Sequence, residues 1–181
     1  MKLIVGLGNK GKEYENTRHN IGFEIINDFL GNIIWQQNSY GYYYKEKNII
    51  YLKPTTFMNL SGIAVNHFVK YYKIKQEDIL IIHDDLDINI GLFKIKYNSS
   101  SGGHNGVQSI LNSLKTSKLL RVKIGILNNK KIDSRDYVLG MFTKKEKETI
   151  NQIKDSINNI INDFILNKSP EYLMNKYNQR K

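Results

Sequence analysis

The stretch ILIIHDDLD, residues 79–87, decides the fold class of this chain. Its first four residues are consecutive apolar side chains, which is typical of a central strand covered on both faces. Such strands belong to α/β domains, in which helices pack against both sides of a sheet. The polar residues that follow therefore come at the carboxyl end of a buried strand, where open α/β sheets bind their ligands.

Strand and helix patterns alternate on both sides of this stretch. Short apolar or alternating runs predict further strands at residues 3–5, 40–44, 49–53, 93–97 and 120–126. Apolar residues at helical spacing predict helices at residues 20–30, 60–71, 107–114 and 150–164. We therefore expect a single α/β domain over residues 1–181, with a mixed β-sheet sandwiched between helices in three layers. A polar surface loop is predicted at residues 128–135, and residues 170–181 are expected to form a loosely held basic tail.

Charge and composition narrow the function classes. The chain carries 27 Lys and Arg against 17 Asp and Glu, a formal net charge of +10. This excess favours a polyanionic partner such as nucleic acid, although a chain so rich in Lys, Asn and Ile is also typical of an A/T-rich genome. The absence of cysteine excludes disulfides, thiolate metal sites and a cysteine nucleophile. With no apolar run of transmembrane length and no signal peptide, we expect a cytoplasmic location and no membrane partner.

The segment GLGNKG, residues 6–11, has the spacing of a dinucleotide-binding loop. In such a site the helix opens inside the motif, and an acidic residue ends a second strand about twenty residues later. Neither condition is met, so we exclude a bound NAD. We expect the glycines to form a tight turn that presents Asn9 at the carboxyl end of the first strand.

A histidine stands where a polar loop turns into a helix, in TRHN at residues 17–20. His19 is either an incidental neighbour of a helix cap or a general base at the bottom of a cleft. Asp84 follows the buried strand, at the same edge of the sheet as the loop after the first strand. A carboxylate beside an imidazole fixes its tautomer and stabilises the imidazolium, so His19 and Asp84 form a candidate acid–base pair.

Two further segments add candidate binding residues. In PTTFMNLSG, residues 54–62, Phe57 and Met58 precede a helix, and a hydrophobic staple accounts for only one of them. In SSSGGHNG, residues 99–106, a glycine-rich loop enters a helix and is suited to hold an anion or a carbonyl group, or to act as a lid. The last residues of this loop reach toward the same cleft: His104 and Asn105.

Residue chemistry alone leaves three functions open. The first is a hydrolase in which histidine activates water and amides hold the oxyanion. The second is a polar pocket that binds RNA without catalysis. The third is a metal-dependent phosphoesterase that uses Asp84, Asp85 and Asp87, although their spacing fails the calcium-loop pattern.

The motifs together resemble the bacterial peptidyl-tRNA hydrolase family. The matching segments are VGLGNKG…Y…TRHNIGF, PTTFMNLSG, IIHDDLD and SGGHNG, and their order and spacing agree over essentially the whole chain. The resemblance implies a monomeric enzyme, free of cofactor and metal, that hydrolyses the ester between a peptide and the 3′ ribose of tRNA. It would recycle tRNA from prematurely released peptidyl-tRNA.

The resemblance also implies roles for individual residues. His19 matches the catalytic base, Asp84 the acid that orients it, and Asn9 the amide that helps distinguish N-blocked from free aminoacyl groups. Four residues match the wall of the peptidyl and 3′-end site: Tyr14, Phe57, Met58 and Asn59. His104 and Asn105 match the lid and water-positioning residues, and Lys96 and Lys123 match a clamp for the tRNA 5′-phosphate.

The chain departs from the family pattern at two positions. Lys10 replaces a proline that usually follows the first asparagine, and Lys123 replaces the arginine of the phosphate clamp. Lysine keeps the charge but loses the bidentate fork. If the two clamp lysines lie on neighbouring strands, their ammonium groups come close, which makes sense when an anion lies between them. A non-catalytic RNA-binding protein on the same fold, as in chloroplast splicing-factor relatives of the family, is the main alternative.

Overall fold

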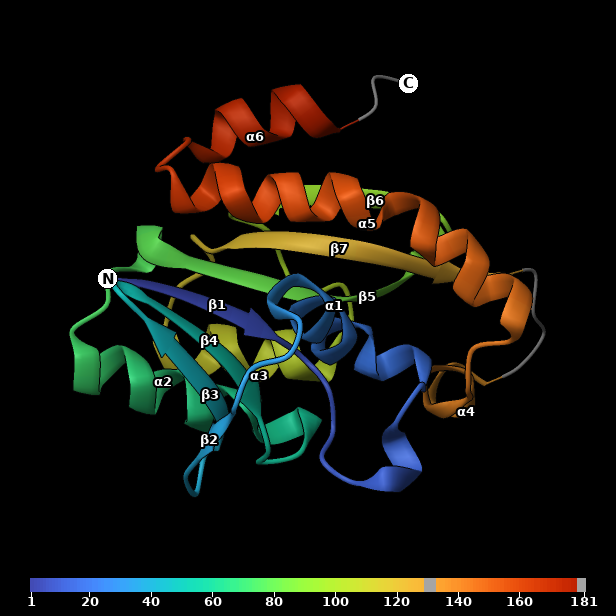
Figure 1. The fold of residues 1–181 in the computed structure, drawn as a ribbon, viewed down its shortest axis with the longest axis horizontal. Coiled ribbons are helices and arrows are strands. Elements are labelled where there is room, and N and C mark those ends of the chain that lie inside the picture. Colours follow the sequence, from blue (N-terminus) through green and yellow to red (C-terminus); the bar gives the residue numbers. More distant parts are fainter. Residues whose placement is uncertain (129–132, 179–181) are drawn as a thin grey trace.

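A seven-stranded mixed sheet forms the centre of the molecule in a computed structural model that describes residues 1–128 and 133–178. In spatial order the strands are β2 (Gln36–Gln37), β3 (Gly41–Glu46), β4 (Ile49–Pro54), β1 (Lys2–Gly6), β5 (Ile79–Asn89), β7 (Leu120–Leu127) and β6 (Phe93–Tyr97). Four neighbouring strands, β4, β1, β5 and β7, are parallel, and the strands that pair with them on either side, β3 and β6, run antiparallel to them; the short edge strand β2 is antiparallel to β3. Figure 1 shows β1 and β5 side by side in the middle of the sheet.

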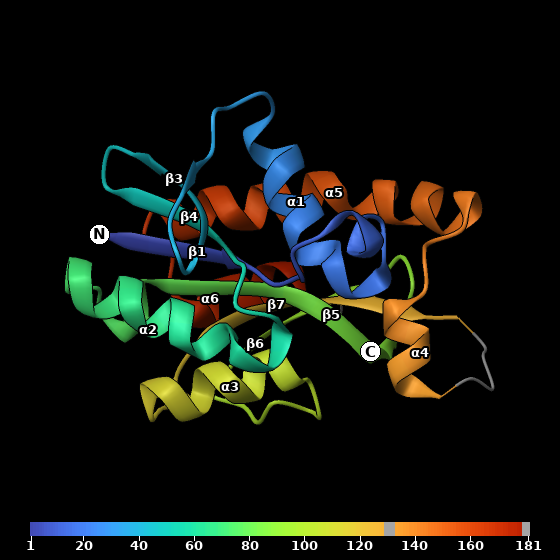
Figure 2. The same ribbon diagram turned by 90° about the horizontal axis from the view of Figure 1, so that it is seen from below.

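Helices cover both faces of the sheet, so the predicted three-layer α/β fold is confirmed (Figure 2). Helices α1 (Ile21–Leu30) and α5 (Lys144–Ile165) pack on one face, and α2 (Ser61–Tyr72) and α3 (Asn105–Leu114) pack on the other. The apolar repeat predicted for the long helix lies on its buried side, from Ile150 to Phe164. None of the helices among the described residues has the length and apolarity needed to span a membrane.

The C-terminal segment differs from the expected loose tail. Residues 170–177 form helix α6 (Pro170–Tyr177), whose Leu173 is fully buried against the core. Ser169 caps this helix, and the Asn178 side chain exchanges two hydrogen bonds with the backbone of Ile95 on the edge strand β6. Residues 179–181 of the predicted tail lie outside the described residues.

The predicted loop at 128–135 is shorter than expected, because helix α4 (Ser134–Leu139) begins inside it. Asp133 caps α4 by accepting a hydrogen bond from the backbone of Arg135. Residues 129–132 of that loop lie outside the described residues. Helix α4 therefore stands at the end of the molecule where the carboxyl ends of the parallel strands lie, as Figure 2 shows.

The glycines at the end of β1 and in the loop that follows allow close packing more than they allow a turn. A Cβ atom on Gly6 would lie 2.2 Å from the carbonyl oxygen of Gly22, and one on Gly8 would lie 2.8 Å from the ring of Phe23. Only Gly11 of the three has a positive φ, at 128°. The expectation of a glycine turn is therefore wrong for Gly6 and Gly8, which let α1 approach β1.

Strand β5 is longer than the apolar run predicts. It pairs with β1 only as far as Ile82, opposite Gly6, but continues beside β7 past Asp85 and ends at Asn89. Asp84 thus lies inside β5 and not at its end. The carboxylate is nevertheless open to the cleft side because β1 has already ended, which leaves the site at the carboxyl end of β1.

Candidate active site

A cleft of about 920 Å³ opens beyond the carboxyl end of β1, beside β5. It brings together every residue that the sequence assigned to catalysis or to substrate binding: Asn9, Tyr14, His19, Phe57, Met58, Asn59, Asp84, His104 and Asn105. The two clamp lysines do not line it. The parallel strands β1 and β5 deliver Asn9 and Asp84 to the same edge, which is the reason for their convergence.

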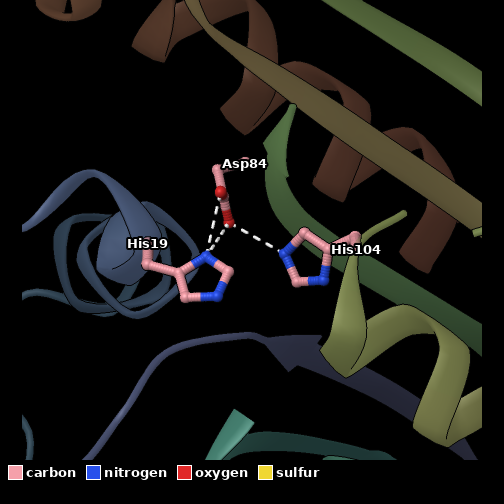
Figure 3. Close-up of side chains that lie close together, drawn as sticks. All are labelled: His19, Asp84 and His104. Atoms are coloured by element: carbon pink, nitrogen blue, oxygen red, sulfur yellow. Dashed lines mark hydrogen bonds and ion pairs between the residues drawn. The ribbon is translucent and has the colours of Figure 1, made fainter. Parts of the chain in front are cut away.

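Asp84 lies between two histidines from different parts of the chain (Figure 3). Both of its carboxylate oxygens are 2.9 Å from Nδ1 of His19, which belongs to the short helix Arg18–Asn20. Its Oδ1 is also 2.9 Å from Nε2 of His104, the N-cap residue of α3. Only 2% of Asp84 is exposed, so both hydrogen bonds form out of water, where they are strong.

The hydrogen-bond partners assign the protons of both imidazoles. His104 Nδ1 accepts a hydrogen bond from the backbone N–H of Val107, so its proton is on Nε2 and is donated to Asp84. His19 donates its Nδ1 proton to the same carboxylate. This leaves Nε2 of His19 as a lone-pair acceptor in the cleft, which is the form a general base requires.

Asp84 stays ionised in this arrangement. Burial alone would raise the pKa of Asp84, but the charges and hydrogen bonds of His104 and His19 outweigh it and hold the pKa well below its ordinary value. An ionised carboxylate against Nδ1 stabilises the imidazolium that forms when His19 takes a proton.

His83 packs beneath the lid histidine and takes no part in the cleft. It donates its Nδ1 proton to the backbone carbonyl of Asp84 at 2.7 Å, and its ring stands edge-on to that of His104 at 4.7 Å. Complete burial, with His104 and Arg121 nearby, holds the pKa of His83 well below its ordinary value. The side chain is therefore neutral and acts as packing.

Asn9 is held by its amide oxygen, and its amide nitrogen has no hydrogen-bond partner among the described residues. Its Oδ1 accepts the backbone N–H of Met58 at 2.8 Å, which leaves the Nδ2 donor available to a ligand in the cleft. The Asn20 side chain fixes the Asn9 backbone with two hydrogen bonds, one to the N–H at 2.8 Å and one to the carbonyl at 2.9 Å. Asn20 therefore braces the loop that carries Asn9.

Arg18 braces the same loop from inside the protein. Its guanidinium binds both carboxylate oxygens of Glu146, at 2.9 and 3.1 Å, and donates to the carbonyl of Tyr137. Glu146 was not found from the sequence. Its position three residues after Thr143 indicates a capping box, which the structure contains, and that local role gives no sign of the buried ion pair.

Phe57 forms the rim of the cleft in a strained backbone conformation. Its φ of 60° and ψ of 158° fall in a region that is nearly exclusive to glycine. The ring is 57% exposed, while the next residue, Met58, is buried under the cleft floor. Strain kept at an exposed aromatic residue indicates that the position of this ring matters for binding.

The lid loop before α3 is tethered by Arg121, which the sequence did not single out. This fully buried arginine donates to the backbone carbonyls of Ser99 and Ser100. Gly102 and Gly103 follow with positive φ values and lead into His104. The lid is thus anchored at its base by Arg121 and at its end by the hydrogen bond from His104 to Asp84.

The clamp lysines differ from the expected pair of unpaired ammonium groups. Strands β6 and β7 are neighbours, as the clamp requires, and pair antiparallel, but Lys96 lies opposite Arg121 and Lys94 opposite Lys123. Lys123 forms an ion pair of 2.5 Å with Asp85 on β5. The carboxylate compensates Lys123, so repulsion between two lysines is no longer an argument for a bound anion, and the clamp stays a prediction.

One group among the described residues has the geometry to hold a metal ion. It consists of His19, Asp84 and His104, whose ligand atoms lie within 4.8 Å of one another. The predicted alternative of three carboxylates is wrong, since Asp85 pairs with Lys123 and also accepts the backbone N–H of Asp87. Both imidazoles already donate to Asp84, so metal binding through these nitrogens would require each ring to move its proton to its other nitrogen, and His104 would then lose the hydrogen bond it accepts from Val107.

Comparisons with known proteins all point to one family. A family model described as peptidyl-tRNA hydrolase matches residues 3–181. A relative from Mycoplasma capricolum named peptidyl-tRNA hydrolase is 44% identical over 188 residues, covering 98% of this chain and all of the relative. One of the same name from Lactobacillus gasseri is 42% identical over 185 residues, with the same coverage. The crystal structure of peptidyl-tRNA hydrolase from Acinetobacter baumannii superimposes with a TM-score of 0.90 at 33% identity, covering all of this chain and 96% of that one.

Proposed function

This chain belongs to the peptidyl-tRNA hydrolase family and hydrolyses peptidyl-tRNA, and we propose that His19 is the general base of the reaction. The observation that carries this proposal is the hydrogen bond from His19 Nδ1 to the buried Asp84, which leaves Nε2 free in the cleft. Asn9 supplies the amide donor beside it.

The proposed reaction is a direct attack of water on the ester. His19 Nε2 takes a proton from a water molecule as that water attacks the ester carbonyl carbon, and Asp84 stabilises the resulting imidazolium. The Asn9 Nδ2 donor stabilises the negative charge that develops on the carbonyl oxygen. The ester C–O bond then breaks, and the imidazolium returns its proton to the 3′ oxygen of the tRNA ribose. The products are a peptide acid and free tRNA.

The remaining cleft residues bind the substrate in this proposal. They form the walls around the peptidyl group and the 3′-terminal nucleotide: Tyr14, Phe57, Met58, Asn59, His104 and Asn105. Lys96 and Lys123 hold the 5′-phosphate outside the cleft. The enzyme acts in the cytoplasm, since its substrate arises in translation, and it acts as a monomer. It needs no metal ion. Turnover that survives EDTA supports this last point, and turnover that is lost on chelation and restored by a divalent ion contradicts it.

Release of labelled peptide from N-acetyl-aminoacyl-tRNA tests the proposal. His19→Ala should lower kcat by about 10²–10⁴-fold, the usual contribution of a general base, while tRNA binding is largely kept. Asp84→Asn should lower kcat by a smaller factor, because the imidazole remains but is poorly oriented. Near-wild-type turnover in His19→Ala contradicts the assignment of the general base. A larger loss of kcat in Asp85→Asn than in Asp84→Asn would show that Asp84 is not the carboxylate that orients His19. Wild-type protein that binds tRNA without turnover would instead be the non-catalytic RNA-binding protein.

A further inference from the structure

A second cavity of about 430 Å³ adjoins the cleft at Asn9. Asn9 lines both cavities, and Lys10, Tyr42 and Lys53 line only the second. Tyr42 and Lys53 lie directly opposite each other on β3 and β4. The second cavity therefore adjoins the catalytic amide but is built from strands on the opposite side of β1 from β5 (Figure 1).

Lys53 is a buried cation without a carboxylate partner among the described residues. Only 8% of it is exposed, its Nζ donates to Asn27 Oδ1 at 2.7 Å, and it lies 4.0 Å from the ring centroid of Trp35. Burial lowers the pKa of Lys53 to about 8. Buried lysine elsewhere is compensated: Lys2 pairs with Asp78 at 3.3 Å. A buried charge that faces a cavity without a counter-ion is most simply explained by an anion that arrives with a ligand.

A second lysine, Lys10, lines the same cavity. Lys10 Nζ is 5.7 Å from the ring centroid of Tyr42, and Lys53 Nζ is 5.6 Å from it. Two cations beside one aromatic ring suit an anionic group carried on an apolar stem.

The position of the cavity in the sheet indicates which part of the substrate would reach it. The tRNA body is expected on the side of β7 and β6, where Lys96 and Lys123 lie, and the second cavity lies on the side of β4 and β3. Once the ester is at His19, the peptide must leave the cleft away from the tRNA. Glu15 and Glu24 also line the second cavity, and their carboxylates oppose the many negative charges of a phosphodiester backbone more than the single charge of one carboxylate at Lys53.

We propose that the second cavity is a subsite for an acidic side chain of the peptidyl group, which binds through its carboxylate to Lys53 and Lys10. This inference rests on the proposed position of the ester at His19. It gives the enzyme a preference for Asp or Glu near the esterified end of the peptide. Peptides without an acidic residue remain substrates, because the subsite is outside the reacting centre.

The chain carries its own reporter for this subsite. Trp35 is the one tryptophan of the sequence and lies against Lys53, so its fluorescence responds to a ligand there without any hydrolysis. The probes are N-acetyl tripeptide amides that differ only in Glu or Gln at the middle or first position. We expect the better-placed Glu peptide to bind roughly fivefold more tightly than its Gln counterpart, as one charge-assisted contact allows. Lys53→Met should abolish the difference, and Lys53→Arg should retain it.

Lys2→Met is the matched control. Lys2 is also a buried lysine over an aromatic ring, at 4.3 Å from the centroid of Phe164, but it lies at the amino end of β1. This variant should keep the preference for Glu. Equal affinities for Glu and Gln peptides in the wild type, or a preference that survives Lys53→Met, would overturn the subsite. Should Lys53→Met fail to fold, Lys10→Ser at the exposed rim must weaken the preference, and an unchanged preference there overturns it too.

Kinetics separates this subsite from the proposed mechanism. With N-acetyl tripeptidyl-tRNA, the Glu-to-Gln ratio of kcat/KM should be about fivefold in the wild type and about one in Lys53→Met. If His19→Ala turns over normally while the fluorescence preference holds, the mechanism fails and the subsite stands. If His19→Ala is inactive and the preference is absent, the mechanism stands and the subsite fails.

Discussion

At the scale of single residues, the buried charges around the cleft are compensated by partners from distant parts of the chain. Arg18 pairs with Glu146, and Asp84 is shared by His19 and His104. These contacts hold the side chains in place and offset the hydration that their charged groups lose on burial. The positions of His19 and Asp84 therefore depend on these ion pairs and hydrogen bonds between distant residues.

Phe57, at the rim of the cleft, has a strained backbone. Phe57→Gly removes the side chain and relieves the strain at φ 60°, which typically amounts to roughly 1–3 kcal/mol, whereas Phe57→Ala removes the ring and keeps the strain. Both variants should raise KM, because the rim of the cleft loses its aromatic ring. Urea denaturation should show a higher free energy of unfolding for Gly than for Ala. An Ala variant at least as stable as the Gly variant would mean that Phe57 is not strained.

Lys53 gives the stability a pH dependence of defined sign. Burial lowers its pKa from 10.5 to about 8, so between these values the unfolded chain binds more protons than the native protein. Stability then rises with pH across this window, as the native lysine becomes neutral and its burial ceases to oppose folding. The advantage in unfolding free energy of Lys53→Met over the wild type should be largest below pH 8 and shrink toward pH 10.5. Urea denaturation at pH 7, 9 and 10.5 measures it, and a difference that is constant with pH contradicts the shift.

At the scale of secondary-structure elements, the position of His19 depends on how closely α1 approaches the sheet. The helix begins directly after the short helix that carries His19, and it crosses β1 and β5 at Gly22. A Cβ atom on Gly22 would lie 2.4 Å from the backbone nitrogen of Leu7 and 2.5 Å from the carbonyl oxygen of Ile82. Both contacts are with backbone atoms, which cannot turn aside as a side chain does.

Gly22→Ala should therefore push α1 away from the sheet. We expect a loss of roughly 1–3 kcal/mol in the free energy of unfolding, the usual cost of overpacking, together with a lower kcat because His19 moves relative to Asp84. Helix propensity alone predicts the opposite, a gain of about 1 kcal/mol for alanine in a helix. Thermal unfolding and peptide-release kinetics on the same variant decide between them, and a more stable, fully active variant would show that the crossing tolerates a methyl group.

At the scale of the whole molecule, the sheet order separates the two ends of the substrate. The proposed 5′-phosphate clamp lies on β6 and β7 at one side, and the cleft opens at β1 and β5. Lys96→Ala and Lys123→Ala should raise KM for full-length substrate several-fold and leave substrates without the 5′-phosphate nearly unchanged. The effect should weaken as salt is raised.

The ion pair with Asp85 refines this prediction. Lys123→Arg should preserve or improve discrimination by the 5′-phosphate, since a guanidinium can bind the phosphate bidentately. Asp85→Asn should free Lys123 and also strengthen that discrimination. Equal changes in KM with and without the 5′-phosphate, or no change on either substrate, would exclude the clamp and leave two surface lysines.

Much of this protein's fold could be predicted from local patterns in its sequence. The apolar run at 79–82 and the helical repeats of α1, α2, α3 and α5 predict the layered α/β fold because strand and helix periods depend on neighbouring residues. The rule that ligands bind at the carboxyl ends of parallel strands indicated the edge where Asn9, His19 and Asp84 meet, although Asp84 lies inside β5 and not at its end. The tail at 170–177 was mistaken because a short amphipathic helix with few apolar residues reads as polar sequence until its docking surface is known.

Only the tertiary structure decided which partners compensate the buried charges. Arg18 and Glu146 are 128 residues apart, and Asp85 meets Lys123 from another strand. No local pattern names such partners, because a buried charge is satisfied by whichever element packs against it, and that choice is made by the whole core at once. The same holds for the close contact of Gly6 with Gly22 and for the isolation of Lys53. The sequence by itself determined the elements and the catalytic residue types, and the packing of those elements determined which charges are paired and placed Lys53 at a cavity.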